Sequence, residues 1–188
     1  MPLNNKNLSP EIKGRIRQYY RILLSYGDFK QAKYTAGYIL HSKLHNKEDH
    51  RLLESLNCAM IIAYCRPFSG NDKKTNPKIP DLPKSFLKDV PQEEIEIHNV
   101  VLNDRNTLLA HSDSVAAQIT PEVWNIGDTC ILIPLQNDRR APLTLEATKT
   151  FFSLASRLFD KIVYEQKRLE PEMIPYFEHK QMDELISK

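Results

Sequence analysis

The stretch that decides the fold is Ser9 to Gly27, with the sequence SPEIKGRIRQYYRILLSYG. Ser9 is a good N-cap, Pro10 suits the first helical position and Glu11 favours the positive end of a helix. Apolar side chains then recur at helical spacing, at Ile12, Ile16, Tyr19, Tyr20, Leu23 and Leu24. Gly27 followed by Asp28 is typical of a joint between helices, so we expect this helix to end at Gly27.

Outward from this stretch, proline is absent from 11–66, 92–120 and 143–170, the intervals where long helices can run. Periodicity and capping signals predict further helices over 28–44, 48–65, 91–111 and 144–169. Two short runs, 122–125 and 129–135, are joined by Ile126-Gly127-Asp128 and predict a β-hairpin. The sequence therefore predicts an all-α helical bundle of about five main helices, with a small β-hairpin near 122–135.

Composition agrees with this fold class. Five glycines in 188 residues are well below the average of about 7%. Turn-rich all-β folds and glycine-loop nucleotide binders need more glycine than this. The length predicts a single domain over 1–188. It includes a proline-rich loop at 66–91, with a short helical turn near 85–88, and a C-terminal tail at 171–188.

The charge distribution is uneven, although the net charge is only +2. Residues 1–47 carry a net charge of +7 and the remainder −5. A basic half attracts phosphate backbones or an acidic partner, but it also fits an ordinary solvated helix surface.

Cysteine usage and hydropathy indicate the compartment. Three cysteines, with no CxxC pair, argue against structural disulfides and favour a reducing cytoplasm. There is no apolar secretory signal and no run of 18 apolar residues. We therefore expect a cytoplasmic protein without a membrane span.

The strongest chemical signal lies on the expected helix 91–111. Helical spacing places Asp104, Arg105 and His111 in or beside its apolar stripe rather than on the solvated face. Charged groups in that position need partners. A polar site or a polar subunit interface is therefore expected there.

The segment LNDRNTLLAHS at 102–112 resembles the signature of HEPN (higher eukaryotes and prokaryotes nucleotide-binding) domains. That signature is an arginine, a polar residue, a few further residues and a histidine, here Arg105, Asn106 and His111. The resemblance implies a helical bundle that is a metal-independent endoribonuclease or an RNA-binding relative. It also implies a homodimer whose two motifs face each other across a cleft. A role as a toxin or in phage defence, and an antitoxin protein as partner, follow from the same resemblance.

The residue types suit RNA cleavage, because RNA carries its own nucleophile in the 2′-OH. Arg105 can hold two phosphate oxygens, and His111 can exchange a proton with the 2′-OH or the leaving 5′-oxygen. Asn106 can position the phosphate or the histidine, and the spacing suggests that Asp104 orients the imidazole. No cofactor or metal is expected. Alternatively, Arg105 pairs with Asp104 or with a carboxylate elsewhere, His111 caps a helix C-terminus, and the protein is a non-catalytic binding module.

Two further residues are candidates for RNA contact. Arg66, at the end of the expected helix 48–65, can reach phosphate or satisfy terminal carbonyls, and Ser112 follows His111. Trp124 on the hairpin can stack on a base, although core packing is the more usual role of a tryptophan.

The remaining histidines and cysteines carry weaker signals. His41 and His45 are four residues apart, as zinc ligands can be, but no third ligand is evident and no metal site is predicted. Cys58 and Cys65 fit small core residues.

Overall fold

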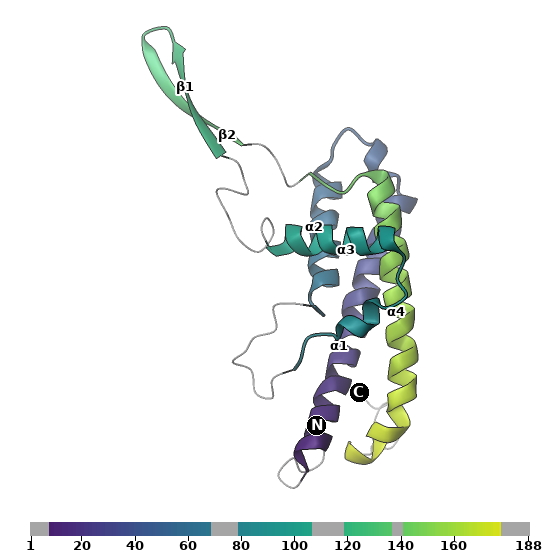
Figure 1. Cartoon of the computed structure of the whole chain (residues 1–188). Coiled ribbons are helices and arrows are strands. Elements are labelled where there is room, and N and C mark those ends of the chain that lie inside the picture. The colour runs from purple at the N-terminus through teal and green to yellow at the C-terminus, as the bar shows by residue number, and fades with distance from the viewer. Residues whose placement is uncertain (1–7, 69–78, 107–118, 137–140, 178–188) are drawn as a thin grey trace, which may run out of the picture.

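The computed structural model describes residues 8–68, 79–106, 119–136 and 141–177, and these are mostly helical (Figure 1). The described elements are α1 (Pro10–His41), α2 (Arg51–Cys65), α3 (Gln92–Asp104) and α4 (Leu145–Met173), with the strands β1 (Ile119–Ile126) and β2 (Thr129–Gln136) and the 3₁₀ turns η1 (Leu44–Asn46), η2 (Lys84–Leu87) and η4 (Ile174–Tyr176). The predicted helical bundle with a small hairpin is confirmed at this level, with four α-helices described instead of about five.

The difference in number comes from α1, because the predicted joint at Gly27 is wrong. α1 runs unbroken for 32 residues, or about 48 Å at 1.5 Å per residue. Its buried side chains continue at helical spacing through the expected break, at Ser25, Phe29 and Ala32. Asp28 also forms an ion pair with Arg66 of α2 instead of capping a second helix. Continuous packing of this face therefore outweighs the local preference for a turn.

Other helix boundaries differ from the predicted ones by a few residues. α2 begins at Arg51 rather than near residue 48, and the carboxylate of Asp49 accepts a 3.0 Å hydrogen bond from the backbone N–H of Arg51. α4 runs through Pro171 to Met173, beyond the expected end at residue 169. Met173 is buried in a small cluster with Ile16 and Tyr19, and this packing outweighs the hydrogen bond that the proline removes.

The helices pack around α1, which contacts both α2 and α4. α3 crosses in front of these helices in Figure 1 and packs on α2 and α4. Where α1 and α4 cross, a Cβ at Gly37 would lie 3.2 Å from Cε2 of Phe152. Gly37 therefore permits a close approach between these two helices, because a side chain there would meet the ring.

The hairpin pairs β1 with β2 in antiparallel register, with Val123 opposite Leu132 and Trp124 opposite Ile131. Gly127 makes the turn with φ +59°, a left-handed conformation that glycine adopts without strain. The predicted hairpin is confirmed and is longer than expected. The favoured core position for Trp124 is wrong, because its side chain is 51% exposed.

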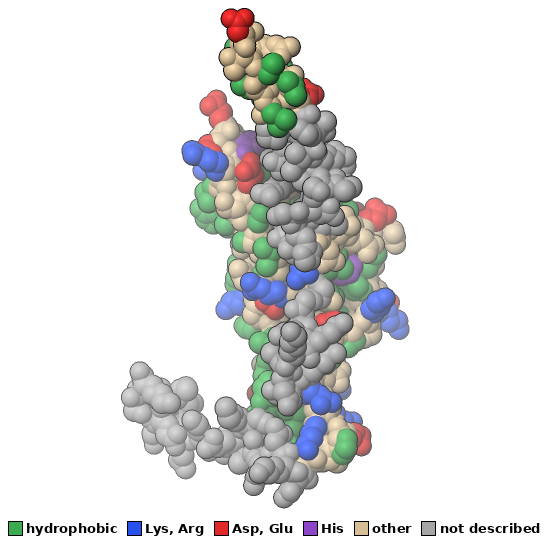
Figure 2. Space-filling view, turned by 90° about the vertical axis from the view of Figure 1, so that its left-hand side faces the viewer, with side chains coloured by type: hydrophobic (Ala, Val, Ile, Leu, Met, Phe, Trp, Pro, Cys, Tyr) green, Lys and Arg blue, Asp and Glu red, His purple; other side chains and the backbone are tan. Residues whose placement is uncertain are grey.

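The hairpin projects away from the helices (Figure 1), and its tip carries hydrophobic and acidic side chains (Figure 2). No residue of 122–133, the part of the hairpin whose side chains the structure describes, belongs to either hydrophobic cluster. Five large apolar side chains are exposed on it, namely Val123, Trp124, Ile126, Ile131 and Leu132. Trp124 stays in solvent because the hairpin extends beyond the core.

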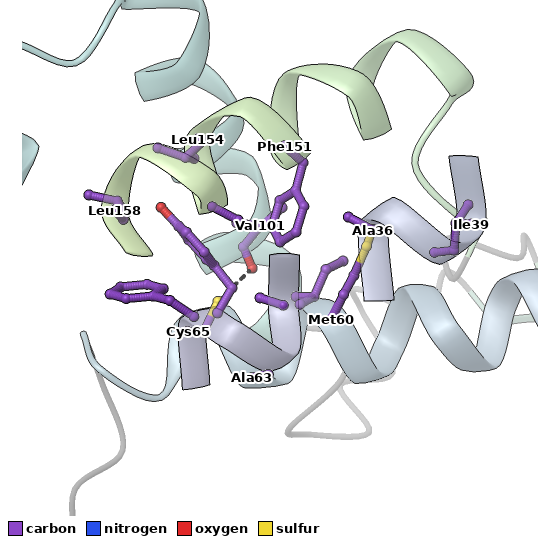
Figure 3. Packing of buried hydrophobic residues seen from close by; sticks show 14 of the residues in the cluster. Ala36, Ile39, Met60, Ala63, Cys65, Val101, Phe151, Leu154 and Leu158 are labelled. Carbon is purple, nitrogen blue, oxygen red and sulfur yellow. Dashed lines mark hydrogen bonds between the residues drawn. The ribbon is translucent and has the colours of Figure 1, made fainter. Parts of the chain in front are cut away.

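The main core lies between α1, α2, α3 and α4, and Figure 3 shows part of it. Phe151, Leu154 and Leu158 of α4 face Met60 and Cys65 of α2 across this core. Within the described ranges, no helix combines the length and apolar character needed to cross a bilayer.

Candidate functional site

The candidate site lies at the C-terminal end of α3. The α-helix ends at Asp104, and Arg105 and Asn106 continue it in a wider π-type turn. His111 and Ser112 lie outside the described residues. The structure thus places three of the four predicted catalytic residues in one consecutive run.

The guanidinium of Arg105 binds the side chain of Asn106. Nη1 of Arg105 donates a 2.9 Å hydrogen bond to Oδ1 of Asn106. Within the described ranges, no carboxylate forms an ion pair with Arg105, so the predicted alternative of an Arg105–Asp104 pair is not what the structure shows. A neutral carboxamide orients the guanidinium without neutralising its charge.

Asp104 is half-buried, as the helical spacing predicted. Burial raises the pKa of its carboxyl above the usual value, because desolvation disfavours the charged form. A cationic or hydrogen-bonding neighbour would therefore be stabilising beside it.

Cys65 of α2 lies under this end of α3. Its Sγ donates a 3.5 Å hydrogen bond to the carbonyl oxygen of Val101, drawn as a dashed line in Figure 3. Burial raises its pKa to about 12, while the charge of Arg105 lowers it and that of Asp104 raises it. Cys65 is thus electrostatically coupled to both motif residues, yet its thiol stays protonated and is a poor nucleophile. Its predicted role as a small core residue is confirmed.

Arg66 directly follows Cys65, so the end of α2 brings a second arginine to this region. Its Nη1 lies 3.4 Å from Oδ1 of Asp28 on α1, and its side chain is 54% exposed. Burial raises the pKa of Asp28, and the guanidinium of Arg66 opposes that shift. Arg66 therefore links the end of α2 to α1.

α3 also carries two buried polar side chains that the sequence analysis did not single out, Glu94 and His98. Both carboxylate oxygens of Glu94 accept hydrogen bonds from Arg157 of α4, at 2.8 and 3.0 Å. Ser153 donates a further bond of 2.9 Å to Glu94. The buried face of α3 contains Glu94, His98 and Val101, which are spaced four and three residues apart. That spacing was the signal that could have revealed them.

A cleft with a volume of about 750 Å³ lies elsewhere, between η2 and α4. Two of the cations that line it have partners, because Arg157 binds Glu94 and Lys161 donates to the carbonyl oxygens of Phe86 and Lys88. None of the predicted site residues that the structure describes lines this cleft.

The structure offers no alternative metal centre in its described ranges, where no three His, Cys, Asp or Glu side chains cluster. Nε2 of His45 lies 3.2 Å from Oγ1 of Thr148. Cys58, Cys65 and Cys130 are all free thiols.

Comparison with known proteins adds no assignment: no family model, no curated protein and no solved structure matches this chain.

Proposed function

We propose that this chain is a HEPN-like, metal-independent endoribonuclease that acts on RNA in the cytoplasm. The observation that carries the proposal is the pair formed by Arg105 and Asn106 at the end of α3. The guanidinium is oriented by a neutral side chain 2.9 Å away and keeps its full charge for an anion.

The chemistry follows from these side chains. The 2′-oxygen of RNA attacks the adjacent phosphorus, and the bond from phosphorus to the 5′-oxygen breaks. Arg105 donates to the non-bridging phosphate oxygens, whose negative charge increases in the transition state. The products are a 2′,3′-cyclic phosphate and a 5′-hydroxyl.

His111 supplies the proton transfer in this proposal, either from the 2′-OH or to the leaving oxygen. Asp104 orients the imidazole of His111. The raised pKa of the Asp104 carboxyl favours this role, because an imidazolium neighbour offsets the cost of its burial.

Arg66 and Ser112 extend the RNA contact beyond the scissile phosphate. Arg66 holds Asp28 through one nitrogen and remains more than half exposed. It therefore has donors left for a second phosphate.

The test is cleavage of labelled RNA by the purified full chain in EDTA. We expect wild type to cleave, and Arg105→Ala and His111→Ala to lose about a hundredfold or more in rate. Product ends identify the chemistry: a kinase should label the new 5′-hydroxyl without prior phosphatase treatment.

Arg51→Ala is the matched control, because Arg51 is an exposed arginine that binds only the exposed Asp49 among its described contacts. It should cleave like wild type. Equal activity in wild type, Arg105→Ala and His111→Ala would show that any cleavage comes from a contaminant and would reject the proposal.

A second candidate function is a non-catalytic interaction module, which the exposed apolar side chains of the hairpin favour. In this reading the hairpin contacts another protein, such as an antitoxin. Overexpression distinguishes the two: a ribonuclease toxin should arrest growth in a manner that depends on Arg105, whereas an interaction module should not.

A further inference from the structure

The cleft between η2 and α4 contains charged groups that the proposed function does not use. Its volume of about 750 Å³ lies within the range of about 300–1,000 Å³ that is usual for small-molecule sites. One wall belongs to α4 and includes Arg157, Lys161 and Tyr164, and the other belongs to the segment 85–89 around η2. Side chains of both signs line the two walls, so the charges that already have partners indicate what a ligand must supply.

Arg157 has part of its guanidinium left for a second anion. Its Nε and Nη2 atoms bind the two oxygens of Glu94, whose side chain is 3% exposed. A guanidinium has five N–H donors, and this contact uses two of them. Because Arg157 lines the cleft and is 40% exposed, the donors on Nη1 and the second donor on Nη2 remain for a ligand. The buried carboxylate fixes the orientation of the guanidinium before a ligand binds.

Lys161 lies one helical turn beyond Arg157, on the same face of α4. Its ammonium donates to the carbonyl oxygens of Phe86, at 3.1 Å, and of Lys88, at 2.5 Å. These acceptors are neutral and use two of its three donors, so the charge and one N–H remain. Arg157 and Lys161 together therefore form a positioned site for a carboxylate.

Two carboxylates line the same cleft, those of Asp89 and Asp160. Neither forms an ion pair within the described ranges, although Asp160 is three residues from Arg157 on α4. Asp89 has a φ of 62°, a left-handed conformation that is uncommon outside glycine and recurs at ligand sites. Charges of opposite sign thus line one cleft without pairing directly, and a ligand that carries both signs would complete them.

The charges of the cleft also balance. Arg157 and Glu165 are each offset by an ion-pair partner that does not line the cleft. The charged lining residues without an ion-pair partner in the described part of the chain are two lysines and two aspartates, namely Lys88, Lys161, Asp89 and Asp160. The aspartates would repel a polyanion such as RNA, and the lysines would repel a simple cation. A ligand with one charge of each sign avoids both penalties.

We propose that this cleft binds a zwitterion of the amino-acid type, with a free carboxylate, a free ammonium and an apolar side chain. It is either a single α-amino acid or a short peptide with both termini free. Arg157 and Lys161 bind the carboxylate, and the two aspartates bind the ammonium. Phe86 and Tyr164 line the cleft, and Tyr164 is 70% exposed, so an apolar side chain of the ligand covers ring surface that water now contacts. The proposal does not depend on RNA cleavage.

Isothermal titration calorimetry of the full chain tests the two charges of the ligand separately. The probes are L-phenylalanine, its amide, which lacks the carboxylate, and N-acetyl-L-phenylalanine, which lacks the ammonium. We expect phenylalanine to bind and each derivative to bind about tenfold or more weakly, because each leaves one pair of charges without its partner. The tripeptide alanyl-phenylalanyl-alanine distinguishes the two sources: it should bind more tightly than phenylalanine if the ligand is a peptide, and more weakly if the ligand is a free amino acid.

Asp160→Asn is the sharpest variant, because Asp160 is exposed and its replacement should leave the fold intact. It should weaken phenylalanine binding about tenfold and abolish the preference for phenylalanine over the acetylated probe. Arg157→Lys should reduce the preference for phenylalanine over the amide. Circular dichroism checks its fold, since Arg157 also binds Glu94. Glu170→Gln, at an exposed acid of α4 that does not line the cleft, is the matched control and should bind like wild type.

Three outcomes would overturn the proposal. The first is no binding of phenylalanine or the tripeptide at about 10 mM, a concentration that fills a site with a Kd of about 1 mM. The second is equal binding of N-acetyl-L-phenylalanine or inorganic phosphate, which would indicate a plain anion site. The third is wild-type affinity in Asp160→Asn. Phenylalanine binding by a chain without ribonuclease activity would leave this proposal intact and reject only the proposed function.

Discussion

The hydroxyl of Tyr64 lies 2.7 Å from Nδ1 of His98 in the core, and this contact joins α2 to the helix that carries Arg105. Burial raises the pKa of Tyr64 well above its usual value and lowers that of His98. Both groups are therefore neutral at neutral pH, and the imidazole tautomer decides which of them donates in this hydrogen bond. The rings meet nearly edge to face, with centroids 5.9 Å apart.

Replacing Tyr64 with phenylalanine removes this hydroxyl and keeps the ring. We expect Tyr64→Phe to lower the free energy of unfolding by about 1–3 kcal/mol, because Nδ1 of His98 stays buried without its partner. Urea denaturation measures the change. Tyr164→Phe, at an exposed tyrosine, should change stability little, and equal stabilities of the two variants would contradict the role assigned to the bond.

His98 should also make stability depend on pH. Its pKa in the folded chain lies below the unfolded value of about 6.5. As the pH falls below about 6.5, the unfolded chain takes up a proton that folded His98 does not. The stability that neutral His98 contributes above this pH is therefore lost progressively as the pH falls toward the lower pKa of His98 in the folded chain.

Urea midpoints between neutral and mildly acidic pH check this expectation. Burial also lowers the pKa of His45, so the wild-type slope contains both histidines. His98→Asn keeps a hydrogen-bond acceptor near Nδ1 and does not titrate, and the difference between the two slopes isolates His98. Identical slopes would show that His98 does not control acid stability.

The Glu94–Arg157 pair should be the principal electrostatic link between α3 and α4. The Glu94 side chain is 3% exposed and that of Arg157 is 40% exposed. We expect Glu94→Gln to cost about 1–3 kcal/mol, less than a fully buried pair, because solvent still reaches the arginine. Thermal or urea unfolding measures the loss.

Acid should weaken the same link. The guanidinium of Arg157 holds the pKa of Glu94 below its usual value. The stability that this ion pair contributes is therefore present above about pH 4.5 and is lost as the pH falls through the pKa of Glu94 in the folded chain. Glu94→Gln should lack this acid-dependent loss. Exposed Glu146→Gln, which removes only a surface pair with Lys149, is the control.

The parts of the fold that follow from local signals were predictable. Ser9 accepts a hydrogen bond from the backbone N–H of Ile12, and Thr144 caps α4 in the same way. The hairpin followed from alternating apolar residues around Gly127. Each of these signals depends on neighbours within a few residues, which a sequence displays directly.

The predictions from sequence were wrong where packing between residues far apart in the chain determined the structure. Gly27 resembles a helix end locally, but the buried row of α1 continues against α2 and α4. Trp124 has the residue type of a core side chain, yet its position on a projecting hairpin exposes it.

The candidate site was predictable only in part. The run from Asp104 to Asn106 was recognisable as a motif, and the half-burial of Asp104 followed from helical phase. The contact of Arg66 with Asp28 joins residues 38 apart, and no spacing rule indicates such a pair.

Two glycines of α1, Gly27 in an exposed position and Gly37 against α4, provide a matched test of helix packing. A Cβ at Gly27 would meet no described atom within 4 Å, whereas a Cβ at Gly37 would lie 3.2 Å from Cε2 of Phe152. At concentrations where the chain is monomeric, Gly27→Ala should raise the free energy of unfolding by about 0.5–1 kcal/mol, the usual gain from alanine in a helix. Gly37→Ala gains the same propensity but must displace the Phe152 ring, so it should be neutral or destabilising. Urea denaturation of both variants gives the comparison. A stabilised Gly37→Ala beside a destabilised Gly27→Ala would mean that the close contact of α1 lies on its outward side even in the monomer.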